Sequence, residues 1–360
     1  MIVNGSLYGG GAEHVIATLA LHLREMGHQV TIGVVHDGGE VLGELKQAGF
    51  AVVTTTRAGH SSASNLKRAI DELGVQIVHS HDLRSLVDAG ICRLRSSRIV
   101  HLHTFHFGNY PHLPWKHLMM ERLASRLPDA LVAVGNVQRA SIVAALGLPE
   151  RRIGTIWNGV DYDAQPDLTG IDTTDGRLRI GSVSTFGEQK GIPTLLQAAK
   201  ILCDRGLRFR LILVGEGPLR ASLQATAAEL GLGGCVEFTG WKPDAARTLL
   251  PTFDVFVQSS YWEAMSVVIL EAMAARRPIV ATTVGENPAV LASGQSAILV
   301  PARDAVELAE ALRRVIEDSA LRARLADSGY AAYVNGFTGR RMADRYATAY
   351  RECLETRGLA

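Results

Sequence analysis

Cysteine is scarce in this chain, and its copies are far apart. Cys92, Cys203, Cys235 and Cys353 are the four cysteines among 360 residues, and no two of them form a Cys-x-x-Cys pair. Disulfide-rich and zinc-binding domains place cysteines close together or at fixed intervals. The sequence therefore excludes a disulfide framework and a zinc–cysteine site, and predicts buried, reduced thiols.

The chain also lacks a surplus of charge and a long apolar run. Its 37 Lys and Arg nearly balance 36 Asp and Glu, for a net charge of +1, so we expect no nucleic-acid partner. The longest apolar run, Ser266–Ala275, is interrupted by Glu271, and no basic segment followed by an apolar one opens the chain. We therefore expect a cytoplasmic protein. Met1–Val3 is short for a central strand, so we expect the recorded start to be a few residues late.

Strand-like and helix-like segments alternate along most of the chain. Residues 12–26 carry an apolar stripe at helical spacing, and Gly27 and the strand-like segment 29–35 follow. This alternation predicts an α/β protein with parallel sheets covered by helices on both faces, and the length predicts two cores. Further strands are expected at 50–55, 75–79, 98–103, 130–135, 178–184, 209–214, 235–239, 253–257, 278–282 and 297–300.

The segment 161–177 breaks the alternation, because it is rich in Asp, Gly and Thr and contains Pro166. We expect an interdomain linker there, between an N-terminal domain over 1–160 and a C-terminal domain over 178–337. The tail 338–360 has apolar residues at helical spacing, and we expect it to pack back on the first domain. Ligands bind at the carboxyl ends of parallel strands, so the expected site is a cleft between the domains.

The segment 258–282 combines a strand, a loop, a helix and a second strand, and it carries two carboxylates. Glu263 lies in the loop, whereas Glu271 lies within the helix, where a carboxylate facing the sheet needs a ligand or partner. The first N–H groups of a helix have no acceptor within it and favour an anion such as pyrophosphate. Here these groups belong to Met265, Ser266 and Val267.

The pair Glu263 and Glu271, separated by seven residues and followed by Ala-Met-Ala and Pro-Ile-Val-Ala-Thr, resembles the signature of family 4 retaining glycosyltransferases of group 1. The resemblance implies the GT-B fold, with two Rossmann-like, doubly wound domains facing each other across a cleft and a C-terminal helix returning to the first. It implies that the first domain binds the acceptor and the second the nucleotide sugar. Four more motifs extend it over nearly the whole chain: Gly9–Glu13, Trp157–Asp161, Lys190-Gly191 and Val214–Pro218.

The resemblance also implies roles for individual donor-side residues. Glu271 accepts hydrogen bonds from the donor ribose, and Glu263 contacts hydroxyls of the transferred sugar near the reaction centre. Lys190 supplies a mobile positive charge to the pyrophosphate. Relatives carry an Arg where this chain has Thr185 and a Glu where it has Ala289, so one expected cation and one acid are missing. For each carboxylate and for Lys190, the alternative is a solvated surface side chain.

Gly9, Gly10 and Gly11 lie where the first strand meets its helix, and their backbone suits close contact with a phosphate or sugar of the donor. His14 stands at the third glycine position of G-x-G-x-x-G, so these residues do not predict a dehydrogenase. The alternative is a turn that only packing requires.

Histidines follow two strands of the first domain. His101 and His103 share one face of their strand, and His79 and His81 end another. Without carboxylates at fixed spacing, we interpret them as core or cleft histidines and not as metal ligands. The motif ending in His106 matches the family's Thr-x-His, whose histidine faces the sugar or acceptor, so the resemblance makes His106 the catalytic candidate. The alternative is a structural histidine.

The segment Tyr110–Arg122 mixes aromatic, basic and long apolar residues on a predicted helix, with Arg93, Arg95 and Arg98 before it. Such a helix can contact an anionic membrane or a lipid-linked acceptor. The alternative is a core helix with a solvated basic face, which is ordinary in α/β domains.

The resemblance implies a glycosyltransferase that moves a sugar from a UDP- or GDP-sugar to a hydroxyl acceptor, a carbohydrate or a lipid-linked one, with retention of anomeric configuration. The resemblance implies bacterial polysaccharide, lipopolysaccharide or glycolipid synthesis, with peripheral contact at the inner face of the membrane left open. Nothing in the sequence requires a metal or other cofactor, so we expect none. Two alternatives remain, a GT-B sugar-nucleotide epimerase and an inactive nucleotide-sugar-binding protein.

Overall fold

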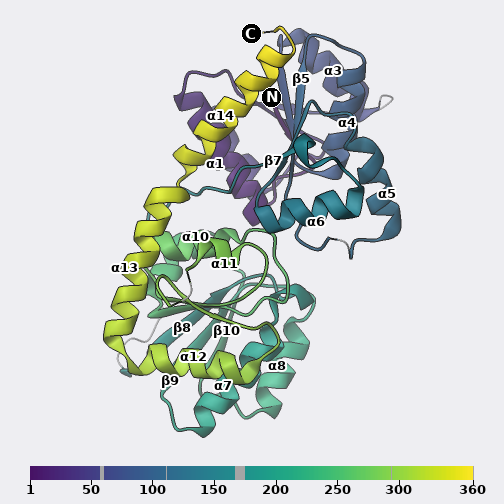
Figure 1. Cartoon of the computed structure of the whole chain (residues 1–360). Coiled ribbons are helices and arrows are strands. Elements are labelled where there is room, and N and C mark those ends of the chain that lie inside the picture. The colour runs from purple at the N-terminus through teal and green to yellow at the C-terminus, as the bar shows by residue number, and fades with distance from the viewer. Residues whose placement is uncertain (57–60, 111, 167–174, 293, 360) are drawn as a thin grey trace. The chain divides into compact units, whose positions relative to one another are not determined.

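The computed structural model describes residues 1–56, 61–110, 112–166, 175–292 and 294–359 (Figure 1). The chain forms two compact units. Unit 1 consists of two segments, Met1–Asp161 and Phe337–Ala360, and unit 2 is Tyr162–Gly336. Part of the segment predicted as a linker, 167–174, lies outside the described residues.

Unit 1 contains a parallel sheet of seven strands in the order β3-β2-β1-β4-β5-β6-β7. The order runs outward in both directions from β1 and β4, so the ends of these two strands form the switch point where doubly wound sheets bind ligands. The strands are β1 (Ile2–Asn4), β2 (Thr31–Val34), β3 (Ala51–Thr54), β4 (Ile77–Ser80), β5 (Val100–Phe105), β6 (Ala130–Ala133) and β7 (Ile153–Thr155). The helices are α1 (Gly11–Glu25), α2 (Glu40–Gln47), α3 (Ser62–Glu72), α4 (Leu83–Leu94), α5 (Trp115–Ala124), α6 (Asn136–Leu146) and α14 (Gly339–Thr356).

Strand β1 is central although it has only three residues. It pairs with both β2 and β4, and Val3 is 1% exposed and packs with Leu66 and Val78. The interpretation of Met1–Val3 as too short for a central strand is therefore wrong. Neighbours on both sides and burial of apolar side chains hold the strand in place, so its length does not decide its position.

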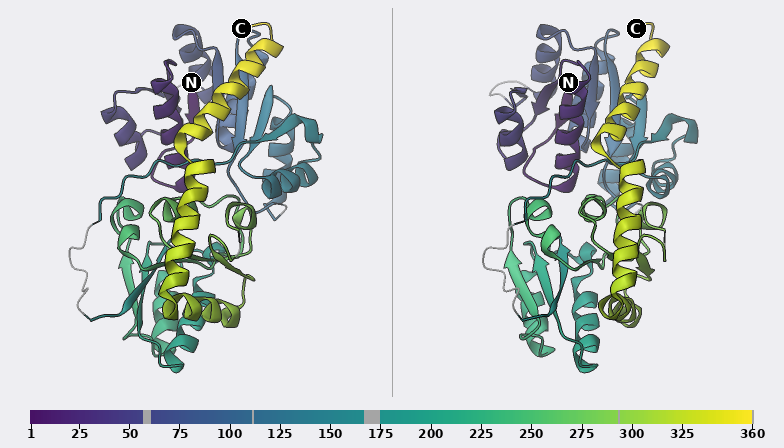
Figure 2. Two further views of the ribbon diagram at one scale, coloured as in Figure 1. Left: turned by 60° about the vertical axis from the view of Figure 1, so that its left-hand side comes forward. Right: turned by 90° about the vertical axis from the view of Figure 1, so that its left-hand side faces the viewer.

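Helix α14 completes unit 1 although it follows unit 2 in the sequence. It packs against α1 and β5 (Figure 2). The segments that leave and re-enter unit 1 are hydrogen bonded, because the Val160 N–H donates to the Phe337 carbonyl and the Gly339 N–H to the Val160 carbonyl, both at 3.0 Å. Gly159 permits this approach, since a Cβ there would lie 2.3 Å from the Thr338 carbonyl oxygen.

Unit 2 contains a parallel sheet of six strands in the order β10-β9-β8-β11-β12-β13, with its switch point between β8 and β11. The strands are β8 (Leu178–Val183), β9 (Phe209–Val214), β10 (Val236–Gly240), β11 (Val255–Gln258), β12 (Ile279–Thr282) and β13 (Ile298–Val300). The helices are α7 (Ile192–Asp204), α8 (Arg220–Glu229), α9 (Ala245–Thr248), α10 (Val267–Ala274), α11 (Asn287–Val290), α12 (Ala305–Glu317) and α13 (Ser319–Gly336).

The cysteines are all free thiols, but only Cys92 is buried. Cys203, Cys235 and Cys353 are partly exposed, so the expectation of buried thiols is wrong for these three. The Sγ atoms of Cys203 and Cys235 lie 3.1 Å apart. Across the described ranges, no helix combines the length and the apolar character needed to cross a membrane.

Candidate active site

Two loops of unit 2 meet at the switch point of its sheet, one after β8 and one after β11. The Tyr261 N–H donates to the Gln189 carbonyl at 2.7 Å, and the Ser259 hydroxyl donates to the Lys190 carbonyl at 2.9 Å. Gly191 takes a φ of +60°, and a Cβ there would lie 2.0 Å from the Ser259 carbonyl oxygen. Only glycine fits at this contact, so Gly191 allows the loop after β8 to pack closely against the loop after β11.

Glu263 and Lys190 form an ion pair between these loops. The Lys190 Nζ atom donates to Glu263 Oε1 at 2.6 Å, and the Ser260 hydroxyl donates to the same oxygen at 2.8 Å. The Gln189 side chain donates to Glu263 Oε2 at 3.2 Å. Because the Glu263 side chain is 8% exposed and that of Lys190 19%, this is a sheltered pair and not a surface contact.

Lys190, predicted as a mobile cation for the pyrophosphate, lies just before a helix and is ion paired. Lys190 ends a short 3₁₀ turn, Glu188–Lys190, and α7 begins only at Ile192. Its charge is neutralised by Glu263, and a phosphate group at this site would have to compete with that carboxylate.

The N-terminus of α10 presents backbone donors at the end of β11. Ser266 is the N-cap residue, and its side chain does not cap the helix because it accepts a hydrogen bond from Gln258 Nε2 at 2.6 Å. Within the described residues, the N–H groups of Ser266 and Val267 donate no hydrogen bond. Met265, the third residue predicted here, is buried beside them. Unused amides at a helix N-terminus favour an anion.

Glu271 is the second carboxylate of the motif, and its environment differs from that of Glu263. The side chain is half-buried on α10 and makes no hydrogen bond or ion pair with any residue that the structure describes. Burial raises the pKa of Glu271 from its ordinary value of 4.5 to about 7. A carboxylate held in this way is stabilised by a ligand that donates hydrogen bonds to it.

Thr185 and Ala289, where relatives carry an Arg and a Glu, are both exposed in unit 2. Thr185 follows β8, and Ala289 lies in α11 after β12. An acid is nevertheless present close to Ala289, because Glu286, one turn earlier, is fully buried and its N–H donates to the Ala264 carbonyl at 2.9 Å.

The glycine turn of unit 1 holds an acidic side chain. The N–H groups of Gly9 and Gly10 both donate to the Glu13 carboxylate, and Gly11 is the first residue of α1. An acid in the first turn of a helix accepts hydrogen bonds from the amides there, and its negative charge interacts favourably with the positive end of the helix dipole. Close contact of Gly10 and Gly11 with the donor stays a prediction, and a phosphate that approached the Gly9 and Gly10 amides would have to compete with the Glu13 carboxylate.

His106 lies at the end of β5, beside the switch point of unit 1. Its Nε2 atom is 2.9 Å from Nδ1 of His81, which follows the neighbouring strand β4. His101 and His103 are buried in β5, and each is hydrogen bonded to the Ser80 hydroxyl, at 2.8 and 2.9 Å. Burial lowers the pKa of His106 to about 4 and that of His101 to about 3, so these rings are neutral at pH 7.

Several contacts of the candidate residues were not predicted from the sequence. Gln189 and Ser260 hold Glu263, Glu13 occupies the glycine turn, and His81 contacts His106. For Gln189 and Ser260, the sequence offered only their positions as a signal, because Gln189 adjoins Lys190 and Ser260 lies within the motif 258–282. Pairing between loops depends on their paths, which residue spacing does not reveal.

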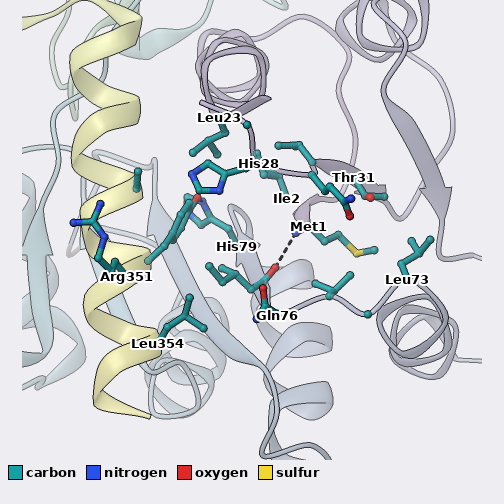
Figure 3. Close-up of a pocket in the computed structure, with 18 residues that line it drawn as sticks. Met1, Ile2, Leu23, His28, Thr31, Leu73, Gln76, His79, Arg351 and Leu354 are labelled. Carbon is teal, nitrogen blue, oxygen red and sulfur yellow. Dashed lines mark hydrogen bonds between the residues drawn. The ribbon is translucent and has the colours of Figure 1, made fainter. Parts of the chain in front are cut away.

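A cavity of about 550 Å³ lies in unit 1 at the amino ends of β1, β2 and β4, the end of the sheet opposite to His106 (Figure 3). The Met1 amine donates there to the Ile77 carbonyl at 2.8 Å, and Arg351 of α14 lines one side. The candidate residues lie instead at the carboxyl ends of the strands. In the part of the chain that the structure describes, no three His, Cys, Asp or Glu side chains group in a way that could hold a metal ion.

Comparison with known proteins connects both units to one family. The model described as "Glycosyltransferase Family 4" matches residues 9–164, and the model described as "Glycosyl transferases group 1" matches residues 177–318. The lipopolysaccharide core biosynthesis glycosyltransferase LpsD of Rhizobium meliloti is 30% identical over 262 residues, which cover 71% of this chain and 72% of LpsD. LpsE of the same organism is 33% identical over 198 residues, which cover 55% of this chain and only 56% of LpsE.

Solved structures share the fold over nearly the whole chain. Anabaena Alr3699/HepE in complex with UDP and glucose aligns with a TM-score of 0.87 at 22% identity and covers 98% of this chain and 99% of its own. A glycosyltransferase from Rickettsia africae aligns with a TM-score of 0.83 at 20% identity and 98% coverage of both chains. The two-unit α/β fold is confirmed, and with the match to LpsD and the family models on both units, the chain belongs to glycosyltransferase family 4, the group 1 glycosyl transferases of the GT-B fold.

Proposed function

We propose that this chain transfers a sugar from a nucleoside-diphosphate donor to a hydroxyl of a carbohydrate or lipid-linked acceptor. The observation that carries the proposal is Glu271, a half-buried carboxylate that makes no hydrogen bond or ion pair with a described residue, on a helix where the N–H groups of Ser266 and Val267 also have no acceptor among those residues. A ribose offers hydroxyl donors to a carboxylate, and a diphosphate offers acceptors to amides. One nucleoside diphosphate therefore fits both needs. The UDP-glucose complex of HepE supports UDP as the first nucleotide to test.

Donor binding would exchange the partners of Lys190 and Glu263. In the free protein the two charges neutralise each other at 2.6 Å. A diphosphate brings negative charge to the same loops and competes with the Glu263 carboxylate for the ammonium group. Glu263 is then free to accept hydrogen bonds from hydroxyls of the sugar that is transferred.

In the proposed reaction, the bond between the anomeric carbon and the diphosphate oxygen breaks while the acceptor oxygen bonds to the same carbon. The acceptor proton passes to a diphosphate oxygen on the face that the leaving group has vacated, which retains the anomeric configuration. Lys190 and the amides of Ser266 and Val267 stabilise the departing charge, and His106 contacts the sugar. Since these groups supply the positive charge, we propose that turnover continues in EDTA.

The printed names of the relatives indicate a cellular role. LpsE and LpsD act in lipopolysaccharide core biosynthesis, and AmsK of Erwinia amylovora, 30% identical over 199 residues, in amylovoran biosynthesis. We therefore propose that this chain acts in the synthesis of a bacterial surface polysaccharide or lipopolysaccharide.

A panel of UDP- and GDP-sugars, scored by nucleotide release to water, tests the proposal without knowledge of the acceptor. We expect one donor to be hydrolysed, Glu271→Gln to weaken nucleotide binding, and Glu263→Gln to lower kcat more than binding. Glu307→Gln, which changes an exposed acid of α12, is the matched control. A changed nucleotide sugar formed without acceptor would indicate an epimerase, and nucleotide binding without turnover of any donor or acceptor would indicate an inactive protein. Either result overturns the proposal.

Helix α5 supports a second part of the proposal, contact with an anionic membrane. Four large apolar side chains of α5 are exposed, which contradicts the alternative of a core helix with only a basic face outside. Exposed cations accompany them, whereas the one acid of the helix, Glu121, is buried and accepts a hydrogen bond from Tyr110. Arg93 does not contribute, because it is paired with Asp129. The exposed apolar residues are Trp115, Met119, Met120 and Leu123, and the exposed cations are Lys116, Arg122 and Arg126.

Co-sedimentation with vesicles tests this contact. We expect binding to phosphatidylglycerol vesicles that weakens with salt, and little binding to phosphatidylcholine vesicles. The double variant Trp115→Ser/Leu123→Ser should lose binding. Leu94→Ser is the control, because Leu94 is 71% exposed but lies on α4. Equal binding by both variants would show that α5 is not the membrane surface.

A further inference from the structure

One ring nitrogen of His106 is held by the protein, and the other is not. Nε2 lies 2.9 Å from Nδ1 of His81, and the two rings are stacked with centroids 5.2 Å apart and planes at 24°. Nδ1 of His106 has no hydrogen-bond partner among the residues that the structure describes, and the side chain is partly exposed. The geometry therefore leaves Nδ1 as the atom of His106 that meets a ligand.

The position of the proton between His81 and His106 determines whether Nδ1 of His106 donates or accepts a hydrogen bond. Burial lowers the pKa of His81 well below its ordinary value and that of His106 to about 4, so each ring carries one proton at pH 7. The other nitrogen of His81, Nε2, is buried and has no hydrogen-bond partner in the part of the chain that the structure describes. An unpaired N–H is tolerated in a protein interior less readily than an unpaired lone pair. His81 therefore carries its proton on Nδ1 and donates it to Nε2 of His106.

His81 is itself fixed by a buried group that includes α14. The His79 ring packs against the His81 ring at a centroid distance of 4.0 Å, with the two planes tilted by 40°. Both nitrogens of His79 are used, since Nδ1 is 2.7 Å from the Tyr350 hydroxyl and Nε2 is 2.8 Å from the Thr104 hydroxyl. The Thr104 hydroxyl is in turn 3.0 Å from that of Tyr346. The supporting rings cannot turn without breaking these contacts.

We propose that His81 is a positioning residue that holds His106 in the tautomer with its proton on Nδ1, so that His106 donates a hydrogen bond to an oxygen of the bound sugar. Free histidine favours the opposite tautomer, so the protein imposes this one through the donor at His81. The proposal goes beyond the assignment of His106 and rests on the proposed function, in which His106 contacts the sugar.

Nitrogen NMR of imidazole-labelled protein tests the tautomer directly. In the wild-type chain we expect the His106 signals of a protonated Nδ1 and an unprotonated Nε2, without any ligand. His81→Phe keeps a stacked ring but removes the donor, and should shift His106 toward the Nε2-protonated form. Tyr350→Phe is the matched control, because it removes a hydroxyl from the same buried group without touching His106. A wild-type His106 protonated on Nε2, or a tautomer unchanged in His81→Phe, overturns the proposal.

Hydrolysis of UDP-glucose, or of whichever donor the panel identifies, supplies the kinetic test. We expect His81→Phe to lower kcat by about 10- to 100-fold with little change in KM, the size of loss that misplaced reacting groups produce. In a His106→Gln background, the same change should have no further effect, whereas independent structural damage would add. If His106→Gln leaves turnover intact, the proposed role of His106 fails; if it lowers turnover but His81→Phe does not, the positioning role alone fails.

Discussion

Glu271→Gln should stabilise unit 2 increasingly as the pH rises. Burial raises the pKa of Glu271 from 4.5 in the unfolded chain to about 7 in the folded one. The folded state therefore binds this proton more tightly, and the contribution to stability is present below about pH 4.5 and is lost as the pH rises through about 7. One pKa unit corresponds to about 1.4 kcal/mol, so the shift gives an upper bound of about 3 kcal/mol, which residual exposure of the side chain reduces. Glutamine does not ionise, so the variant does not lose stability in this way as the pH rises.

Hydrogen exchange of the amides of β11 and β12, compared between variant and wild type at the same pH, measures the effect locally. At pH 5.5 the variant should be protected by about 1 kcal/mol more than the wild type, and at pH 8 by up to about 3 kcal/mol more. Glu263→Gln is the control: it breaks the ion pair with Lys190 and should lower protection by about 1–3 kcal/mol at both pH values. Addition of UDP at pH 8 should reduce the difference in protection between Glu271→Gln and the wild type, because ribose hydroxyls stabilise the ionised carboxylate of the wild type. A stability difference that is the same at both pH values would refute the reasoning.

Three further predictions concern the loop after β8. Lys190→Met should weaken UDP binding by about 10- to 100-fold in isothermal titration, or about 1.4–2.8 kcal/mol, because it removes the cation that we propose for the diphosphate; unchanged affinity would contradict a place for Lys190 in the donor site. Gly191→Ala should lower the unfolding free energy by about 1–3 kcal/mol, because φ is +60° and the new Cβ would lie 2.0 Å from the Ser259 carbonyl, whereas Gly187→Ala, with open space around it, should change it little; equal effects in urea denaturation would contradict the contact. Thr185→Arg should tighten UDP binding by up to about tenfold, since it adds a cation at an exposed position after β8, and a weaker complex would show that the loop does not need this charge.

Much of the fold could be predicted because parallel α/β units leave a strong periodic signal. The strands expected at 209–214 and 278–282 correspond to Phe209–Val214 and Ile279–Thr282, and the apolar stripe at 12–26 to Gly11–Glu25. The edge strand Ile153–Thr155 was not predicted, since three residues with one buried side chain give little periodicity. The order of the strands in each sheet could not be predicted from the sequence either, because it depends on which strands each helical crossover connects.

The candidate site was predictable as a set of residue types but not as a set of partners. The segment from Gln258 to Thr282 shows that Glu263 and Glu271 flank a helix start, because their spacing is local. Glu263 pairs with Lys190, whereas Glu271 has no partner in the described ranges, and this difference follows from burial and from the meeting of two loops. Likewise, the Thr-x-His motif indicates His106, but only the pairing of β4 with β5 brings His81 to it.

The division of unit 1 into two segments has a consequence for biosynthesis. Its first segment leaves the ribosome before the 175 residues of Tyr162–Gly336, and α14 follows them. At about 5–20 residues per second, the delay is about 10–35 s. Throughout this interval the nascent N-terminal half has β5 without its covering helix and His79 without Tyr350. Unit 2, being continuous, can fold first, so the half that contains His106 matures last and is the one most dependent on chaperones during translation.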